Sequence, residues 1–167
     1  MRKVTLYIAA SLDGYLSRAD GSVDWLPVPS AGEDYGYADF LASVDTLVMG
    51  RKTYAQTLTF GPWPYAGRRT FVCSRTRTGR GEGDVEFVAE DAADFVGALR
   101  REPGGGIWLV GGAEIVRACL AARVVDEIVL SIPPVLLGAG RGLFPSAETL
   151  TQLELRDCRT FADGLVQ

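Results

Sequence analysis

The chain contains no histidine among its 167 residues, and it has only three cysteines. Histidine is the commonest general acid or base near neutral pH and the commonest metal ligand, so its absence argues against a zinc enzyme or a serine-triad hydrolase. The cysteines, Cys73, Cys119 and Cys158, are scattered along the chain and odd in number. They are typical of reduced thiols in a cytoplasmic protein rather than of a disulfide framework.

Long apolar runs are also missing, because no run reaches the roughly 18 residues that a membrane span needs. The first residues, Met1 to Val4, lack the apolar region and cleavage site of a signal peptide. We therefore expect a cytoplasmic protein with no membrane partner. The hydrophobic fraction of 47% and the length of 167 residues are ordinary for one globular domain over residues 1–167.

Acidic residues are absent from one window, although the whole chain has a net charge of −4. Between Thr46 and Gly81 there is no Asp or Glu, and seven Arg and Lys residues give the window a charge of +7. The other residues carry 10 basic and 21 acidic side chains. The overall charge argues against nucleic acid as a partner, whereas the local positive block suits a small polyanion. A solvated basic face is the alternative explanation.

Apolar strand patterns alternate with helical patterns along most of the chain. They predict strands at 4–10, 46–49, 69–73, 85–88, 107–110 and 124–132, and helices at 33–43, 51–58, 91–101 and 113–122. Such alternation is typical of an α/β fold with a mostly parallel central sheet and helices on both faces. A late strand at 153–161, with no helix after it, predicts antiparallel C-terminal strands.

Three of the predicted strands end in residues that suit phosphate groups. Gly111 and Gly112 let a ligand approach the backbone, although they could form only a tight turn. The residues from Gly50 to Thr53 combine a helix start with two cations, and Ser74 and Arg75 offer a hydroxyl beside a guanidinium. Because ligands bind at the carboxyl ends of strands in such sheets, the three segments together could hold a dinucleotide. None contains the G-x-G-x-x-G fingerprint of an ordinary Rossmann site.

The segment from 11 to 30 is rich in Gly, Pro, Ser and Asp, and it is long for a plain connection. Loops of this kind often act as lids or binding loops. Asp13 and Asp24 are polar candidates there, but Asp also commonly bonds its own backbone in turns. Asp34, near the start of a predicted helix, could instead face a pocket and orient or protonate a substrate.

Taken in order, three segments resemble the cofactor motifs of the dihydrofolate reductase superfamily. They are Met49-Gly-Arg-Lys-Thr-Tyr54, Arg69-Thr-Phe-Val-Cys-Ser-Arg75 and Trp108-Leu-Val-Gly-Gly-Ala-Glu114. Two further segments, Ser11-Leu-Asp-Gly14 and Pro134-Val-Leu-Leu-Gly138, are more similar to the branch that contains the riboflavin-biosynthesis reductase (C-terminal) domain and uncharacterised bacterial dihydrofolate-reductase-like proteins. The resemblance covers nearly the whole chain.

The resemblance implies an NADPH-binding, dihydrofolate reductase-like fold and a homodimer. It places Gly50, Arg51, Lys52 and Thr53 at the adenosine and pyrophosphate phosphates, and Ser74 and Arg75 at the 2′-phosphate. Gly111 and Gly112 would contact the pyrophosphate across a cis peptide bond, with Ala113 and Glu114 in the same cofactor motif. Ala9 and Ala10 would approach the nicotinamide through their backbone.

The resemblance also implies two candidate catalytic residues. Counting back from Met49 without gaps, Asp34 falls where dihydrofolate reductases place an acidic residue on the first helix, although the Trp-Leu-Pro segment at 25–27 is displaced from the family pattern. Asp13 belongs to the S-x-D-G motif and could equally brace its loop through hydrogen bonds. An apolar substrate pocket would be built from the aromatic residues Tyr15, Trp25, Tyr35, Tyr37 and Tyr54.

The leading hypothesis is therefore an NADPH-dependent reductase that transfers a hydride to a small substrate, such as a pterin- or pyrimidine-like heterocycle. Folate itself is not the expected substrate. A riboflavin-pathway 5-amino-6-(5-phosphoribosylamino)uracil reductase is the alternative within this class, although these residues include no deaminase domain. A non-catalytic NADP-binding protein is the alternative outside it, and a nucleic-acid binder built on Arg68 to Arg80 is the least favoured hypothesis.

Overall fold

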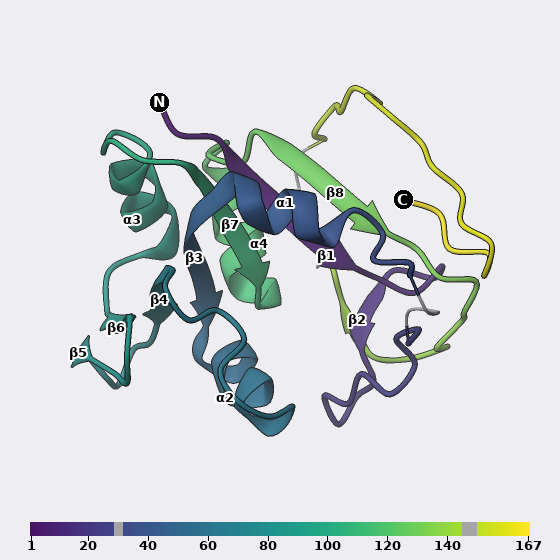
Figure 1. Cartoon of the computed structure of the whole chain (residues 1–167), viewed down its shortest axis with the longest axis horizontal. Coiled ribbons are helices and arrows are strands. Elements are labelled where there is room, and N and C mark those ends of the chain that lie inside the picture. The colour runs from purple at the N-terminus through teal and green to yellow at the C-terminus, as the bar shows by residue number, and fades with distance from the viewer. Residues whose placement is uncertain (29–31, 145–149) are drawn as a thin grey trace.

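The computed structural model describes residues 1–28, 32–144 and 150–167, and its centre is a seven-stranded sheet (Figure 1). The strand order is β5-β6-β4-β3-β7-β1-β8. These strands are β1 (Val4–Ala9), β3 (Val44–Gly50), β4 (Arg69–Cys73), β5 (Gly79–Arg80), β6 (Val85–Val88), β7 (Gly106–Gly111) and β8 (Glu127–Ser131). Every neighbouring pair is parallel except β5 with β6. Strands β2 (Tyr15–Ser17) and β9 (Arg141–Gly142) form a separate antiparallel pair. The predicted α/β class with a mostly parallel sheet is confirmed.

Helices cover both faces of the sheet, and Figure 1 shows α1 in front of it and α4 behind it. The helices are α1 (Tyr37–Ser43), α2 (Arg51–Thr59), α3 (Ala92–Leu99) and α4 (Ala113–Ala121). Successive strand side chains point to opposite faces. Accordingly, Val48 of β3 joins the cluster that α3 and α4 cover, while its neighbours Leu47 and Met49 join the cluster next to α1. No helix in the described part of the chain is long and apolar enough to cross a membrane.

The predicted helix at 33–43 begins only at Tyr37, so its first turn was wrong. Tyr35 and Gly36 have φ angles of 55° and 76°, which belong to the left-handed region and interrupt a right-handed helix. The acidic residues before Tyr37 therefore lie in a turn that leads into α1.

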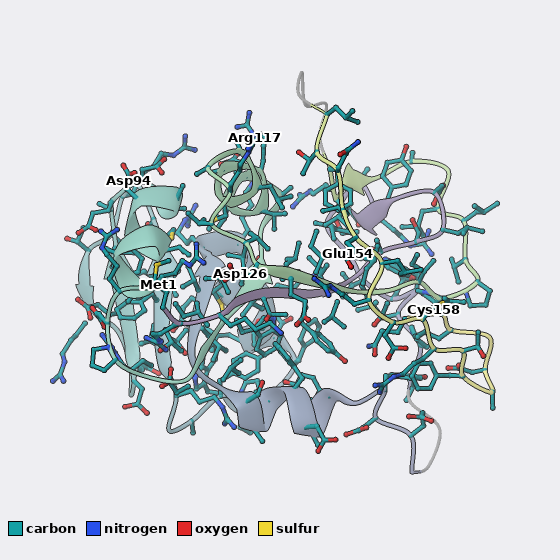
Figure 2. All side chains as sticks on the ribbon, turned by 90° about the horizontal axis from the view of Figure 1, so that it is seen from above. Met1, Asp94, Arg117, Asp126, Glu154 and Cys158 are labelled. Atoms are coloured by element: carbon teal, nitrogen blue, oxygen red, sulfur yellow. The ribbon has the colours of Figure 1, made fainter. Side chains whose placement is uncertain are left out.

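The predicted strand at 153–161 was wrong except at its end. There Arg159 and Gln167 exchange two backbone hydrogen bonds of 2.8 Å, and the Phe161 nitrogen donates to the Leu165 carbonyl oxygen at 2.9 Å, so the pairing of this end is antiparallel as predicted. Residues 150–160 are all exposed, and the pairs that form near the C-terminal segment, Ile132 with Val166 and Thr160 with Val166, are isolated antiparallel bridges. Figure 2 shows Glu154 and Cys158 on this segment, with Cys158 on the side of the molecule away from Asp94. The alternation of Leu153 and Leu155 with polar residues predicted a half-buried strand, but the side chains of both leucines are exposed.

A buried arginine links the start of β1 to the start of β3. Arg2 is only 5% exposed, and its guanidinium pairs with the carboxylate of Asp45. It also donates to Thr46 Oγ1 at 2.7 Å and to the carbonyl oxygen of Gly105 at 2.7 Å. The second Asp45 oxygen accepts a hydrogen bond from the Gly105 N–H at 2.6 Å. Three segments far apart in sequence are therefore held together at the amino edge of the sheet.

We predict that Asp45→Ala lowers the free energy of unfolding by about 1–3 kcal/mol, because it leaves a buried guanidinium without its charged partner. Urea denaturation at pH 7 measures this loss. The control is Glu127→Ala, which removes an exposed ion pair with Lys3 and should cost less than about 1 kcal/mol. Equal losses in the two variants would contradict the assigned role of Asp45.

Candidate functional site

The ends of β3, β4 and β7 meet at the carboxyl edge of the sheet. Gly50 is paired with Cys73 of β4, and Met49 is paired with Gly111 of β7. A Cβ atom added to Gly112 would lie 3.6 Å from both the Gly50 nitrogen and Thr53 Oγ1. The three segments that the sequence marked for phosphate binding are thus brought together. The expected cis bond between Gly111 and Gly112 is not found, since the described residues contain no cis peptide.

The starts of the helices α1 to α4 differ in how their backbone N–H groups are satisfied. Asp91 caps α3 by accepting from Ala93 and Asp94 nitrogens. Asp34 accepts from the nitrogen of Ala38, in the first turn of α1. The starts of α2 and α4 follow Gly50 and Gly112, and no side chain among the described residues caps either of them. Uncapped N–H groups and the helix dipole favour a bound anion, so these two starts suit phosphate groups.

Exposed cations lie beside these helix starts. Arg51 and Lys52 occupy the first turn of α2, and Arg75 follows β4. Ser74 is 8% exposed, and its Oγ accepts from the backbone nitrogens of Thr76 and Arg77 at 3.3 and 3.2 Å. Because those bonds occupy only acceptor positions, the Ser74 hydroxyl proton remains available to a phosphate oxygen.

Other cations of the basic window contact groups of the protein itself. Arg68 donates to the carbonyl oxygen of Leu41 at 3.1 Å, and Arg69 pairs with Glu102 at 3.0 Å. Arg77 stacks over the ring of Phe87, with its guanidinium carbon 3.9 Å from the ring centroid. The basic window of the sequence is therefore not one continuous binding surface.

A cavity of about 490 Å³ opens next to the glycine turns. It is lined by Tyr7, Ile8, Ala9, Leu16, Val23, Leu26, Pro27, Glu33, Asp34, Tyr35, Tyr37, Thr53, Gln56, Thr57, Phe60, Trp108, Val110, Gly111, Gly112, Ser131 and Leu165. Most of these side chains are apolar or aromatic, which is usual for a small-molecule site. Some predicted cofactor and substrate residues are among them, namely Ala9, Thr53, Gly111, Gly112, Asp34, Tyr35 and Tyr37.

The remaining predicted site residues lie outside this lining. Those predicted for the cofactor are Ala10, Gly50, Arg51, Lys52, Ser74, Arg75, Ala113 and Glu114, all at or after strand ends. Of the aromatic candidates, Tyr54 packs against Trp63 and Phe87 with ring centroids 5.4 and 5.5 Å apart. Tyr15 lies in β2, and Trp25 is 8% exposed.

Asp34 lies at the cavity with its carboxylate already engaged. One oxygen accepts from the Gly36 nitrogen and the other from the Ala38 nitrogen, both at 2.9 Å. These backbone hydrogen bonds, with that from Ala38 the stronger influence, lower the pKa of Asp34. The side chain is therefore ionised at neutral pH, where it can accept hydrogen bonds from a ligand but is a poor proton donor.

Asp13 does not line the cavity, and its carboxylate joins two loops. It accepts from Ser11 Oγ at 2.6 Å, from the Leu137 nitrogen at 3.1 Å and from the Gly138 nitrogen at 2.7 Å. The S-x-D-G segment and the P-V-L-L-G segment are thus connected through this one side chain. The geometry matches the loop-bracing alternative that the sequence left open.

The sequence did not predict Tyr7, Trp108, Ser131 and Leu165 as cavity residues. They come from β1, β7, β8 and the C-terminal segment, so their proximity depends on the tertiary fold. Ser131 alone carried a usable signal, because it is a polar residue that ends the apolar run of β8.

We predict that Asp13→Asn lowers the melting temperature at pH 7, since the amide keeps only one acceptor oxygen for three donors. The hydrogen bond from Ser11, followed by those from Leu137 and Gly138, lowers the pKa of Asp13. A lowered folded-state pKa stabilises the protein above the unfolded value of about 4, and this contribution is lost as the pH falls through the folded value.

The difference in melting temperature between Asp13→Asn and the unchanged protein should therefore shrink at acid pH. Thermal unfolding followed by circular dichroism from pH 7 down to pH 3 tests this. Glu82→Gln, at an exposed position between β5 and β6, is the control and should leave the melting temperature unchanged. A difference that grows at acid pH would contradict the bracing role.

Comparisons with known proteins agree with this architecture. The chain is 36% identical over 165 residues to the uncharacterized protein YwjB of Bacillus subtilis, covering 98% of this chain and 95% of YwjB. It is 32% identical over 178 residues to the uncharacterized protein YyaP of the same organism, covering 99% and 93%. The crystal structure of a "Putative riboflavin biosynthesis protein" from Shewanella sp. PV-4 matches with a TM-score of 0.85 and 31% identity, covering 99% of this chain and 96% of that one.

A more distant structure shows the same fold. The diaminohydroxyphosphoribosylaminopyrimidine deaminase/5-amino-6-(5-phosphoribosylamino)uracil reductase of Thermotoga maritima matches with a TM-score of 0.71 and 14% identity, covering 99% of this chain and 55% of that one. The model of the RibD C-terminal domain matches residues 2–167. The predicted resemblance and the dihydrofolate reductase-like fold are thereby confirmed, and the chain belongs to the RibD C-terminal domain family.

Proposed function

We propose that the protein is an NADPH-dependent reductase of a small, unphosphorylated substrate. The observation that carries the proposal is the meeting of three strand ends beside the apolar cavity. Uncapped helix starts and exposed cations lie at this edge, and the cavity lies next to it. Family membership supports a reductase, and the substrate and the nucleotide are the parts of the proposal that need testing.

The residues at the strand ends fit a dinucleotide phosphate. Gly112 has a φ of 102°, which disfavours a residue with a side chain, and it lies against Gly50 with no Cβ atom between the two backbones. The backbone at this point is therefore open to a pyrophosphate, with Arg51 and Lys52 on the adjoining helix. Ser74 and Arg75 would hold the 2′-phosphate that distinguishes NADPH from NADH.

NADPH supplies the hydride when it is bound, and the chain supplies orientation and shielding from water. Ala9, at the carboxyl end of β1, lines the cavity and would support the nicotinamide through its backbone. Tyr35, Tyr37 and Trp108 give the cavity aromatic walls that suit a planar substrate. Asp34 would accept a hydrogen bond from the substrate and fix its orientation.

The cavity favours a substrate without a phosphate. Among the described residues of its lining there is no Arg or Lys, and the two charged side chains are the acids Glu33 and Asp34. A phosphate would be repelled by these carboxylates and would find no cationic partner. This observation disfavours the 5-amino-6-(5-phosphoribosylamino)uracil reductase alternative, although the related Shewanella protein carries a riboflavin biosynthesis name.

We predict micromolar binding of NADPH, much weaker binding of NADH, and a loss of about 1.5–3 kcal/mol in NADPH affinity in Arg75→Ala. Isothermal titration calorimetry measures all three. Arg101→Ala is the matched control, because Arg101 is exposed and lies between α3 and β7, before the amino end of that strand. Equal affinity for NADPH and NADH, or equal effects of the two variants, would refute the phosphate assignment.

We further predict that Asp34 gives no inflection in the pH profile of turnover between pH 5 and 8. Its lowered pKa keeps it ionised throughout that range, so it does not act as the proton donor. The profile of kcat/KM for NADPH oxidation tests this with any substrate that a screen finds. Asp34→Asn should weaken turnover at every pH in the range by a similar factor. An inflection that disappears in Asp34→Asn would show that Asp34 transfers the proton.

Two parts of the sequence hypothesis remain proposals. Residues 1–167 would act as one domain, and two copies would form a homodimer, which sedimentation velocity would detect. A non-catalytic NADP-binding protein is the alternative, and NADPH binding with no oxidation across a broad substrate panel would support it.

A further inference from the structure

The last residue of β8 is a serine at the wall of the cavity. Ser131 is 7% exposed and is paired with Ala9 of β1. Its carbonyl oxygen accepts from the Ala10 nitrogen at 3.0 Å, so its backbone is fixed by the sheet. The preceding residues of β8 are apolar from Ile128 to Leu130. A hydroxyl is therefore held at a defined point on a mostly apolar cavity wall.

A chain of hydrogen bonds determines where the hydroxyl protons point. Tyr7 Oη lies 3.2 Å from the carbonyl oxygen of Tyr35, which can only accept, so the single Tyr7 proton is used there. Gln167 Nε2 lies 3.1 Å from Tyr7 Oη, which must then accept from it. This fixes the orientation of the Gln167 amide, because a flipped amide would present an acceptor to an oxygen with no proton left.

The same amide nitrogen lies 3.1 Å from Ser131 Oγ. Its two protons are thus divided between Tyr7 and Ser131, and Ser131 Oγ also acts as an acceptor. The proton of Ser131 Oγ then has no acceptor among the hydrogen bonds of the described residues, while the residue itself lines the cavity. Burial raises the pKa of Tyr7, which keeps the proton that orders this chain in place at neutral pH.

We propose that Ser131 donates a hydrogen bond to an acceptor atom of the substrate, a carbonyl oxygen or ring nitrogen, and that Gln167 positions it for this. The inference rests on the proposed function, because it treats this cavity as the substrate's. With this donor, the cavity would make two different polar contacts with the substrate. Asp34 accepts from the substrate, and Ser131 donates to it, so the substrate needs both a donor and an acceptor to be held in one orientation.

Matched probes of one bicyclic skeleton test the donor directly. 1-Indanone and indane differ in one carbonyl oxygen, and ligand-observed NMR with the full chain measures their affinities. The unchanged protein should bind 1-indanone about 5-fold tighter than indane, the usual effect of one added hydrogen bond. Ser131→Ala should bind the two equally, and Ser131→Thr, which keeps the hydroxyl, should retain the preference.

Gln167→Glu reverses the direction of the hydrogen bond between residue 167 and Ser131 and leaves Ser131 itself unchanged. A carboxylate only accepts, so it would draw the Ser131 proton away from the cavity and remove the preference for 1-indanone. If Gln167 had only a structural role, Gln167→Glu would weaken the binding of both probes by the same factor. If Gln167→Glu does not fold, as judged by circular dichroism, the two Ser131 variants still decide the proposal.

Three results would overturn the inference. The unchanged protein could bind the two probes equally, it could fail to bind 1-indanone, or the preference for 1-indanone could survive in Ser131→Ala. NADPH titration of the same samples separates its failure from that of the proposed function. A carbonyl preference without NADPH binding would refute the reductase and leave the Ser131 donor standing. NADPH binding without the preference for 1-indanone would refute the Ser131 donor and leave the proposed reductase standing.

Discussion

The close approach of Gly50 and Gly112 is the constraint on which the candidate site depends. A Cβ atom on Gly50 would lie 3.3 Å from the Ile115 side chain, and Gly111 and Gly112 have φ angles of 142° and 102°. Without side chains at these points, β3 and β7 can end side by side and pass directly into α2 and α4. The two uncapped helix starts are therefore neighbours, and the cavity opens beside them.

Local patterns were enough to predict the parallel strands of the sheet and the edge at which they end, because each parallel strand is a short apolar run followed by a turn. The failures occurred where distant contacts decide the local structure. Tyr35 adopts a left-handed conformation while its hydroxyl binds the carboxylate of Asp163, a contact that raises the Tyr35 pKa to about 12. No pattern around residue 35 could reveal a partner at residue 163, so the predicted helix began too early.

The two halves of the candidate site also differ in how far local sequence patterns could predict them. The phosphate-binding half consists of contiguous turns such as Gly50 to Thr53, and sequence motifs identify it directly. The cavity half combines single side chains from several elements, among them Tyr7, Ser131 and Leu165. An aromatic residue alone does not indicate which side of a helix will face a cavity. For this reason the sequence could not show that Tyr54, predicted for the substrate pocket, packs against Trp63 and Phe87 instead.

Charge divides the site into two regions with different tasks. Cations such as Arg51 and Arg75 flank the helix starts, whereas the cavity lining carries Glu33 and Asp34. A polyanionic nucleotide and a neutral or cationic substrate would thus each be favoured in its own region and disfavoured in the other. The chain has no histidine, and the lowered pKa of Asp34 removes that one carboxyl group of the cavity as an acid near pH 7. A proton needed by the proposed reduction would therefore not come from Asp34, and the contribution of Asp34 would be to orient the substrate.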